Sequence, residues 1–208
     1  MELSTWFAFA SASIALLLIP GPTVLLVLSY AISQGRPVAL STVAGVALGD
    51  LIAMSASLAG LGALVLASAE LFLLLKWVGA IYLVYLGIKL FRSAPHASLG
   101  LTAETSSAPA RKVFGHATAV TALNPKSIVF FIAFVPQFIN PSAALAPQFA
   151  ILIATFVGFA AINALAYALL ADKLRQKIAH PRVIPLLTRI GGGFLVAMGV
   201  ATAAIRRS

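Results

Sequence analysis

Residues 4–30 of the chain read STWFAFASASIALLLIPGPTVLLVLSY and contain no charged side chain. The hydrocarbon core of a bilayer is about 30 Å thick, and a helix needs roughly 20 apolar residues to cross it. This stretch therefore predicts a membrane-spanning helix. We expect the helix to be broken at Pro20-Gly21-Pro22, because proline removes a backbone hydrogen bond and clashes with the preceding turn.

Five further apolar stretches follow the first one. The chain has 208 residues, of which 61% are hydrophobic and only 9% are charged, and its mean hydropathy is +1.04. A soluble domain spends roughly 25% of its residues on charged side chains, so this composition excludes a soluble protein. We predict an all-α integral membrane protein with six transmembrane helices, which cover residues 4–30, 38–66, 71–91, 113–138, 145–171 and 186–205.

The chain has a net charge of +9, and its basic residues are distributed unevenly along the sequence. Ten Lys and Arg lie in or beside the loops that join spans one and two, three and four, and five and six. Only Arg206 and Arg207 lie on the opposite side. Cytoplasmic loops carry such an excess, so we expect both termini to face away from the cytoplasm. The basic residues form no single face with interleaved aromatic residues, which argues against a nucleic-acid partner.

The residue inventory excludes several kinds of chemistry. The chain has no Cys, which rules out disulfides, thiolate nucleophiles and Cys-ligated metal centres. His96, His116 and His180 have no metal-ligand spacing, so we expect neither a metal nor a cofactor. The membrane interior offers one Asp and one Lys but no deep His, which does not make a catalytic set. We therefore do not expect an enzyme.

An internal repeat relates the two halves of the chain. GAIYLVYLG at residues 79–87 aligns with GGGFLVAMG at 191–199. In the same way, Gly45 aligns with Gly158, and Asp50 aligns with Asn163. Each repeat has three spans, an odd number, so the second must be inverted relative to the first, as in many secondary transporters. We divide the single membrane domain, 1–208, into repeat one at about 1–91, a cytoplasmic linker at 92–112 and repeat two at about 113–208.

Helix breaks occupy corresponding places in the two repeats, Pro20-Gly21-Pro22 in the first span and Asn124-Pro125 in the fourth. Asn124 is a good N-cap and Pro125 suits the first helical position, while Pro22 would open a second half-helix after Gly21. Each half-helix would direct free N–H groups and a positive dipole end inward, and two such ends could hold a carboxylate. The alternative is a pair of packing kinks.

Ionisable residues lie deep within two of the spans. Asp50 lies about 12 residues into span two, roughly 18 Å from its start at 1.5 Å per residue, and Lys126 lies at comparable depth in span four. Acids at such depth mark proton relays, ion sites or buried pairs. Asp50 is therefore either a proton-coupling group or half of a structural ion pair with Lys126. Asn163, the repeat counterpart of Asp50, would supply a neutral hydrogen-bonding group or join helices.

Glycines at helical spacing favour close contact between helices. Gly45 and Gly49 in span two match the small-xxx-small pattern, which is mostly a packing signal. Spans three and six carry further glycines at aligned positions of the repeat. We assign a packing role to six residues: Gly45, Gly49, Gly79, Gly87, Gly191 and Gly199.

These motifs, taken in order, resemble those of the LysE/RhtB family of bacterial amino-acid exporters. The likeness covers essentially the whole chain. It is carried by Pro20-Gly21-Pro22, Gly45-x-x-x-Gly49-Asp50, the segment from Lys76 to Gly87, and the segment from Leu123-Asn124-Pro125-Lys126 to Phe138.

The resemblance implies a six-helix translocator of the bacterial inner membrane that exports amino acids or close derivatives. Expected substrates are basic amino acids, threonine, homoserine or homoserine lactones, and coupling to the proton gradient is expected. The implied partners are the substrate, protons and the lipid bilayer, and a homo-oligomer is left open. Two other classes stay open from the residues. A passive small-solute channel shares broken helices with carriers, whereas a structural or assembly subunit would not need a buried acid.

Overall fold

The computed structural model describes residues 1–19, 21–34, 36–67, 69–93, 108–171 and 183–204, and all regular structure in these ranges is helical. The chain begins with α1 (Leu3–Leu18) and α2 (Pro22–Gln34), whose axes differ by 55°. The helices α3 (Arg36–Ala67) and α4 (Ala69–Ser93) complete the first half. The second half contains α5 (Ala110–Ala122), α6 (Pro125–Val129), the π-helix η2 (Phe130–Phe134), the 3₁₀-helix η3 (Val135–Phe138), α7 (Leu145–Leu169) and α9 (Val183–Ala204).

The predicted all-α class is confirmed, and each predicted span coincides with helix to within a few residues. Among the described residues, two helices are long and apolar enough to cross a membrane, one over Val38–Gly62 of α3 and the other α7. Two bent pairs, α1 with α2 and α5 with the helical run Pro125–Phe138, would add two crossings if each pair is one span. The apolar part of α9, Thr188–Ala204, is shorter.

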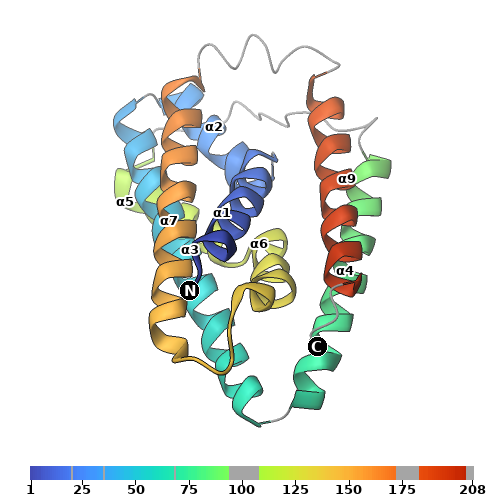
Figure 1. Cartoon of the computed structure of the whole chain (residues 1–208). Coiled ribbons are helices and arrows are strands. Elements are labelled where there is room, and N and C mark those ends of the chain that lie inside the picture. The colour runs from blue at the N-terminus through green and yellow to red at the C-terminus, as the bar shows by residue number, and fades with distance from the viewer. Residues whose placement is uncertain (20, 35, 68, 94–107, 172–182, 205–208) are drawn as a thin grey trace.

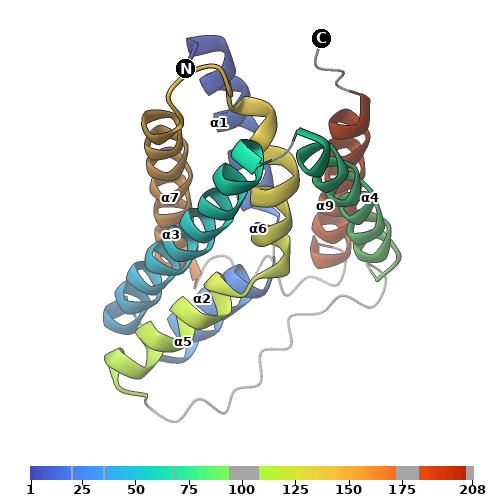
Figure 2. The same ribbon diagram turned by 90° about the horizontal axis from the view of Figure 1, so that it is seen from below.

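The helices form two outer pairs with the broken helices between them. Figure 1 shows α4 and α9 side by side at one edge of the molecule, with α3 and α7 at the opposite edge. The helices α1 and α6 lie between these pairs, and α5 runs along α3 (Figure 2). Large apolar side chains are exposed on the outer surface, among them Leu3, Ile81, Ile162 and Ile190. A surface of this kind is compatible with surrounding lipid.

The contacts between α4 and α9 are reciprocal. A Cβ at Gly87 would lie 2.6 Å from the Gly192 carbonyl oxygen, and a Cβ at Gly199 would lie 2.7 Å from the Ala80 carbonyl oxygen. In the aligned stretches Gly199 corresponds to Gly87, and Gly192 corresponds to Ala80. The same backbone contact is therefore made twice with the two helices exchanged, and it needs a residue without a side chain at both positions.

The other glycines with an expected packing role also lie at contacts between helices. A Cβ at Gly45 or Gly49 would lie 2.6 or 2.7 Å from a carbonyl oxygen of α5. Gly79 of α4 lies against η2, and Gly191 of α9 lies against the chain just after α1. Small residues at these points allow the backbones of neighbouring helices to approach closely.

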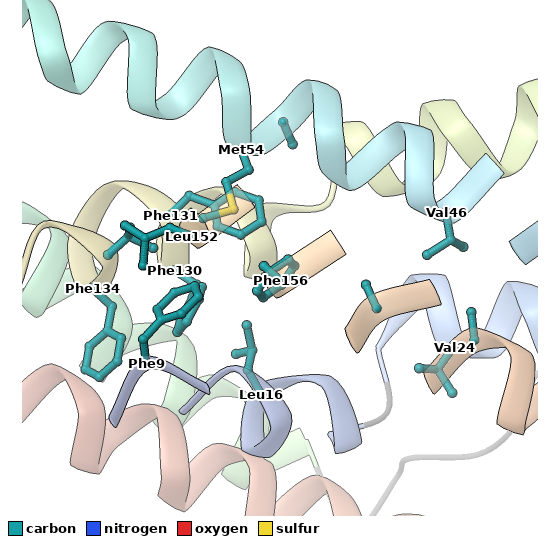
Figure 3. Close-up of a cluster of buried hydrophobic side chains, with 14 of the residues drawn as sticks. Phe9, Leu16, Val24, Val46, Met54, Phe130, Phe131, Phe134, Leu152 and Phe156 are labelled. Carbon is teal, nitrogen blue, oxygen red and sulfur yellow. The ribbon is translucent and has the colours of Figure 1, made fainter. Parts of the chain in front are cut away.

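A cluster of buried aromatic rings fills the space between α1, η2 and α7. Figure 3 shows the rings of Phe9, Phe130, Phe131, Phe134 and Phe156. The ring centroids of Phe9 and Phe130 are 6.4 Å apart, and those of Phe131 and Phe156 are 4.8 Å apart. These separations are typical of packed aromatic pairs, so the cluster closes the space between the three helices.

Candidate functional site

The break in the fourth span is capped by Asn124. Its Oδ1 accepts a hydrogen bond from the backbone N–H of Lys126 at 3.1 Å, and Pro125 takes the first helical position of α6. The Asn124 side-chain amide also donates to Thr23 Oγ1 at 3.1 Å. Because Thr23 is the second residue of α2, this bond joins the start of one half-helix to the start of the other.

The break in the first span brings Gly21 close to Lys126. Helix α2 begins at Pro22, and its first backbone bond runs from the N–H of Leu25 to the carbonyl oxygen of Gly21 at 3.0 Å. A Cβ at Gly21 would lie 3.3 Å from Lys126 Nζ, so a residue without a side chain leaves room for the ammonium. The third predicted residue of this break, Pro20, lies outside the described residues.

The carbonyl end of α1 binds the Lys126 ammonium. Lys126 Nζ donates to the carbonyl oxygens of Leu16 at 3.1 Å and of Ile19 at 2.9 Å. The last carbonyl groups of a helix lack partners within the helix, and they carry the negative end of its dipole. A cation at this end is therefore stabilised both by hydrogen bonds and by the dipole.

Two further donors to the same helix end come from α7. Asn163 Nδ2 donates to the Leu17 carbonyl oxygen at 3.1 Å, and the Tyr167 hydroxyl donates to the Leu18 carbonyl oxygen at 3.3 Å. Residues four apart share one face of a helix, so Asn163 and Tyr167 act together. We did not predict Tyr167, although its spacing from Asn163 was a signal that could have identified it.

Asp50 lies on α3 and is buried, with 3% of its surface exposed. Its Oδ1 has no hydrogen-bond partner in the described part of the protein. Within the same residues no salt bridge joins Asp50 to Lys126, although the two groups interact electrostatically. The direct ion pair considered from the sequence is therefore not formed in this conformation, because the Lys126 ammonium binds the end of α1 instead.

All of these groups surround one small cavity of about 30 Å³, which has room for about one or two water molecules. It is too small for an amino acid. The predicted residues that line it are Gly21, Asp50, Asn124, Lys126 and Asn163. Pro22 and Pro125 begin the adjoining half-helices and do not line it. Thr23, Ser127 and Tyr167 line it as well and were not predicted, because uncharged hydroxyl residues are common in membrane helices.

A second, larger hollow of about 510 Å³ lies near the start of α1. Along α1, Thr5 lines this hollow, Phe9 belongs to the aromatic cluster and Leu16 lines the cavity. In the fourth span, Phe138 lines the hollow and Lys126 lines the cavity, with η2 between them. Along both segments, the aromatic cluster therefore lies between the hollow and the cavity.

Contacts between α2 and α5 bound the cavity in the other direction. The Thr23 and Thr121 hydroxyl oxygens are 3.4 Å apart, and farther along α2 the Tyr30 hydroxyl is hydrogen-bonded to His116 Nδ1 at 2.9 Å. No role is predicted for His116 from the sequence. The cavity thus lies between packed side chains on both sides.

Nearly the whole chain matches a single protein family. Residues 14–205 match the family model described as LysE type translocator. The chain is 33% identical to an uncharacterized membrane protein of Vibrio cholerae serotype O1 over 204 residues, which cover 98% of each chain. It is also 33% identical to a homoserine/homoserine lactone efflux protein of Salmonella typhimurium over 208 residues, the full length of both.

A leucine efflux protein of Salmonella typhimurium is 33% identical over 138 residues, which cover 66% of this chain and 65% of that protein. No solved structure matches the chain significantly.

Proposed function

Because the chain belongs to the LysE type translocator family, we propose that it is a secondary transporter that exports amino acids or close derivatives from the cytoplasm. The names of two relatives, for homoserine/homoserine lactone efflux and for leucine efflux, support this substrate class. The class includes basic amino acids, threonine, homoserine and homoserine lactones. Export takes place across the bacterial inner membrane and is driven by the proton gradient.

The observation that carries this proposal is the central cavity, where both helix breaks meet a buried acid. Asp50, Asn124 and Lys126 line it together with residues of α1, α2 and α7. The cavity offers a carboxylate, an ammonium and amide groups within a membrane protein, where such groups are costly and usually functional. A zwitterionic substrate needs both kinds of partner.

In the proposed architecture, six helices form two inverted repeats, at about 1–91 and 113–208, joined by a cytoplasmic linker. The reciprocal contacts of Gly87 and Gly199 across α4 and α9 support a two-fold relation between the repeats. So does the presence of the aligned residues Asp50 and Asn163 in one cavity. The excess of basic residues in the loops supports an orientation with both termini outside the cytoplasm.

In the proposed mechanism, the half-helix starts at Gly21-Pro22 and Asn124-Pro125 hold the substrate carboxylate, with Asp50 near the substrate amino group. Asp50 also exchanges a proton. The present cavity of about 30 Å³ cannot hold the substrate, so binding requires that the two three-helix units rock apart. Rocking in one direction would open the cavity to the cytoplasm, and rocking in the other would open it toward the hollow beyond the aromatic cluster.

A passive channel and a structural subunit are the competing functions. A channel would need a continuous path in at least one state, whereas the aromatic cluster and the contacts of α2 with α5 bound the cavity here. Counterflow in proteoliposomes separates the alternatives. A carrier exchanges labelled for unlabelled substrate and saturates, a pore does neither, and a structural subunit moves no substrate.

The experiment that tests the function is an export assay across a panel of amino acids. Efflux of each compound is compared between a strain that lacks the gene and a strain that overproduces the protein. We expect increased export of a small group of amino acids, with homoserine and leucine as the first compounds to examine. Equal efflux of every compound from the two strains would refute the proposal.

A further inference from the structure

The carbonyl end of α1 is organised to bind an ammonium group. The carbonyl oxygens of its last turn and of Ile19 are directed to donors from α6 and α7, and Lys126 Nζ takes two of them, those of Leu16 and Ile19. Asn163 and Tyr167 bind the two carbonyl oxygens between them. If Lys126 left, only the Leu16 and Ile19 oxygens would lose a side-chain partner.

We infer that the Leu16 and Ile19 carbonyl oxygens form the subsite for the primary amino group of the exported substrate, and that Lys126 occupies this subsite when no substrate is bound. The inference rests on the proposed function and specifies where that substrate binds. A substrate ammonium presents three N–H donors, as the lysine ammonium does. The two groups therefore fit the same acceptors and compete for them.

Asp50 provides an alternative binding partner for the displaced Lys126 ammonium. In this conformation Asp50 Oδ1 is buried and lacks a hydrogen-bond partner in the described part of the chain, and Asp50 lines the same cavity as Lys126. When the substrate ammonium takes the α1 carbonyls, Lys126 moves to the Asp50 carboxylate. Every buried donor and acceptor named here then has a partner, as buried polar groups generally do.

Gly21 makes this exchange sterically possible. A Cβ at this position would lie 3.3 Å from Lys126 Nζ and 3.5 Å from Cε. A side chain there would crowd the ammonium in its present position, whereas glycine leaves space beside it.

The replacement of the substrate ammonium by Lys126 affects how readily the empty carrier returns to the cytoplasmic side. The Leu16 carbonyl oxygen also accepts a hydrogen bond from the backbone N–H of Ile19 at 3.2 Å. Without substrate and without the lysine ammonium, the Ile19 carbonyl oxygen would have no partner among the described residues, which is costly inside a membrane protein. With substrate bound, the substrate amino group satisfies it. Loss of Lys126 should therefore slow the return of the empty carrier much more than the movement of the loaded carrier.

This difference can be measured in proteoliposomes with labelled homoserine, and with leucine as a second probe. Exchange requires only the loaded carrier, whereas net efflux also requires the empty one to return. We expect Lys126→Met to lower net efflux at least tenfold and exchange less than threefold. Lys89→Met, which removes an exposed charge from α4, is the matched control and should change neither rate.

Chemical rebuilding of the side chain tests whether the ammonium itself is responsible. The natural chain has no Cys, so Lys126→Cys carries a single thiol. Alkylation with 2-bromoethylamine restores an ammonium at lysine length, and alkylation with iodoacetamide adds a neutral group. Net efflux should return only with the ammonium. Equal losses of exchange and efflux, or equal recovery with the neutral group, would overturn the inference.

A test on the unaltered protein covers the case in which the Lys126 variants do not fold. Exchange of labelled homoserine should be inhibited by 3-aminopropan-1-ol, which keeps the primary amine, and not by N,N,N-trimethylhomoserine, which has no N–H group. Inhibition by the trimethyl compound equal to that by the amine would refute the subsite. If the unaltered protein moved neither homoserine nor leucine, the proposed substrate class would fail instead, which is a separate result.

Discussion

Replacement of Asp50 by Asn tests whether this carboxyl group couples export to protons. The substitution keeps the shape of the side chain and removes its ability to carry a proton. Asp50 Oδ1 accepts no hydrogen bond within the described residues, so the variant loses none of the bonds worth about 0.5–1.5 kcal/mol each. The amide adds a buried N–H₂ group, which costs about 1–3 kcal/mol if it finds no partner. We therefore expect the variant to insert and fold, with a stability within about 3 kcal/mol of the parent.

The size of the transport effect follows from the number of carboxyl groups at the site. Asp50 is the only carboxylate among the residues that line the cavity, so we expect one proton to exchange for each substrate. One pH unit is worth about 1.36 kcal/mol per proton, which corresponds to a concentration ratio of about ten. The parent protein should therefore accumulate substrate about tenfold on the acidic side, whereas Asp50→Asn should leave the ratio near one.

The assay uses proteoliposomes loaded with equal labelled homoserine on both sides and a gradient of one pH unit. Valinomycin and equal potassium hold the membrane potential at zero, so that only the proton gradient can drive accumulation. Homoserine exchange without a gradient serves as the control for intact protein. If Asp50→Asn still accumulated homoserine about tenfold, Asp50 would not be the coupling group. Loss of both exchange and accumulation would show that the loaded carrier itself needs the Asp50 carboxylate, as the acceptor of the displaced Lys126, and that its role is not confined to coupling.

The remaining predictions concern orientation, the capped break and the α4–α9 contact. A single cysteine in place of Ser107 should be labelled only after the membrane is permeabilised, and one in place of Ser208 should be labelled from outside. The reverse pattern would overturn the orientation. Asn124→Leu removes the side-chain cap of α6 and so weakens one of the two helix ends, each worth about 0.3–1 kcal/mol. It should raise the KM for free amino acids severalfold and affect lactones less. Equal losses would show that the break does not bind the carboxylate. Gly192→Ala places a Cβ 2.6 Å from a carbonyl oxygen of α4 and should lower the free energy of unfolding by about 1–3 kcal/mol. Its neighbour Gly193 has open space, so thermal unfolding of Gly193→Ala should show no loss, and equal losses in the two variants would contradict the packing argument.

Much of the site could be predicted because its residues carry local signals. A buried acid at Asp50 and a cap followed by proline at Asn124-Pro125 are recognisable from the sequence alone, since each has a cost or a geometry that few positions tolerate. Asparagine at 163 was identified through its alignment with Asp50. All three residues line the cavity.

The partner of Lys126 could not be predicted, because the choice depends on distances between remote segments. The sequence places an acid and a cation at equal depth, but the ammonium binds the end of α1, more than a hundred residues away along the chain. The π-helical turn of η2 and the aromatic cluster were also missed. Phenylalanine is common in apolar spans, and nothing in FFIAF at 130–134 distinguishes a π-helix from an α-helix.

The backbone contact of α4 with α9 predicts where the proposed rocking movement is centred. In the proposed architecture one helix belongs to each repeat, and the contact is made through glycines whose position no side-chain rotamer can adjust. A motion that preserves this contact has its pivot there, and displacement grows with distance from it, as along a lever arm. The pair α3 and α7 at the opposite edge (Figure 1) would then travel farthest. Probes attached to α3 and α7 should therefore report transport, and probes across α4 and α9 should stay at a constant distance.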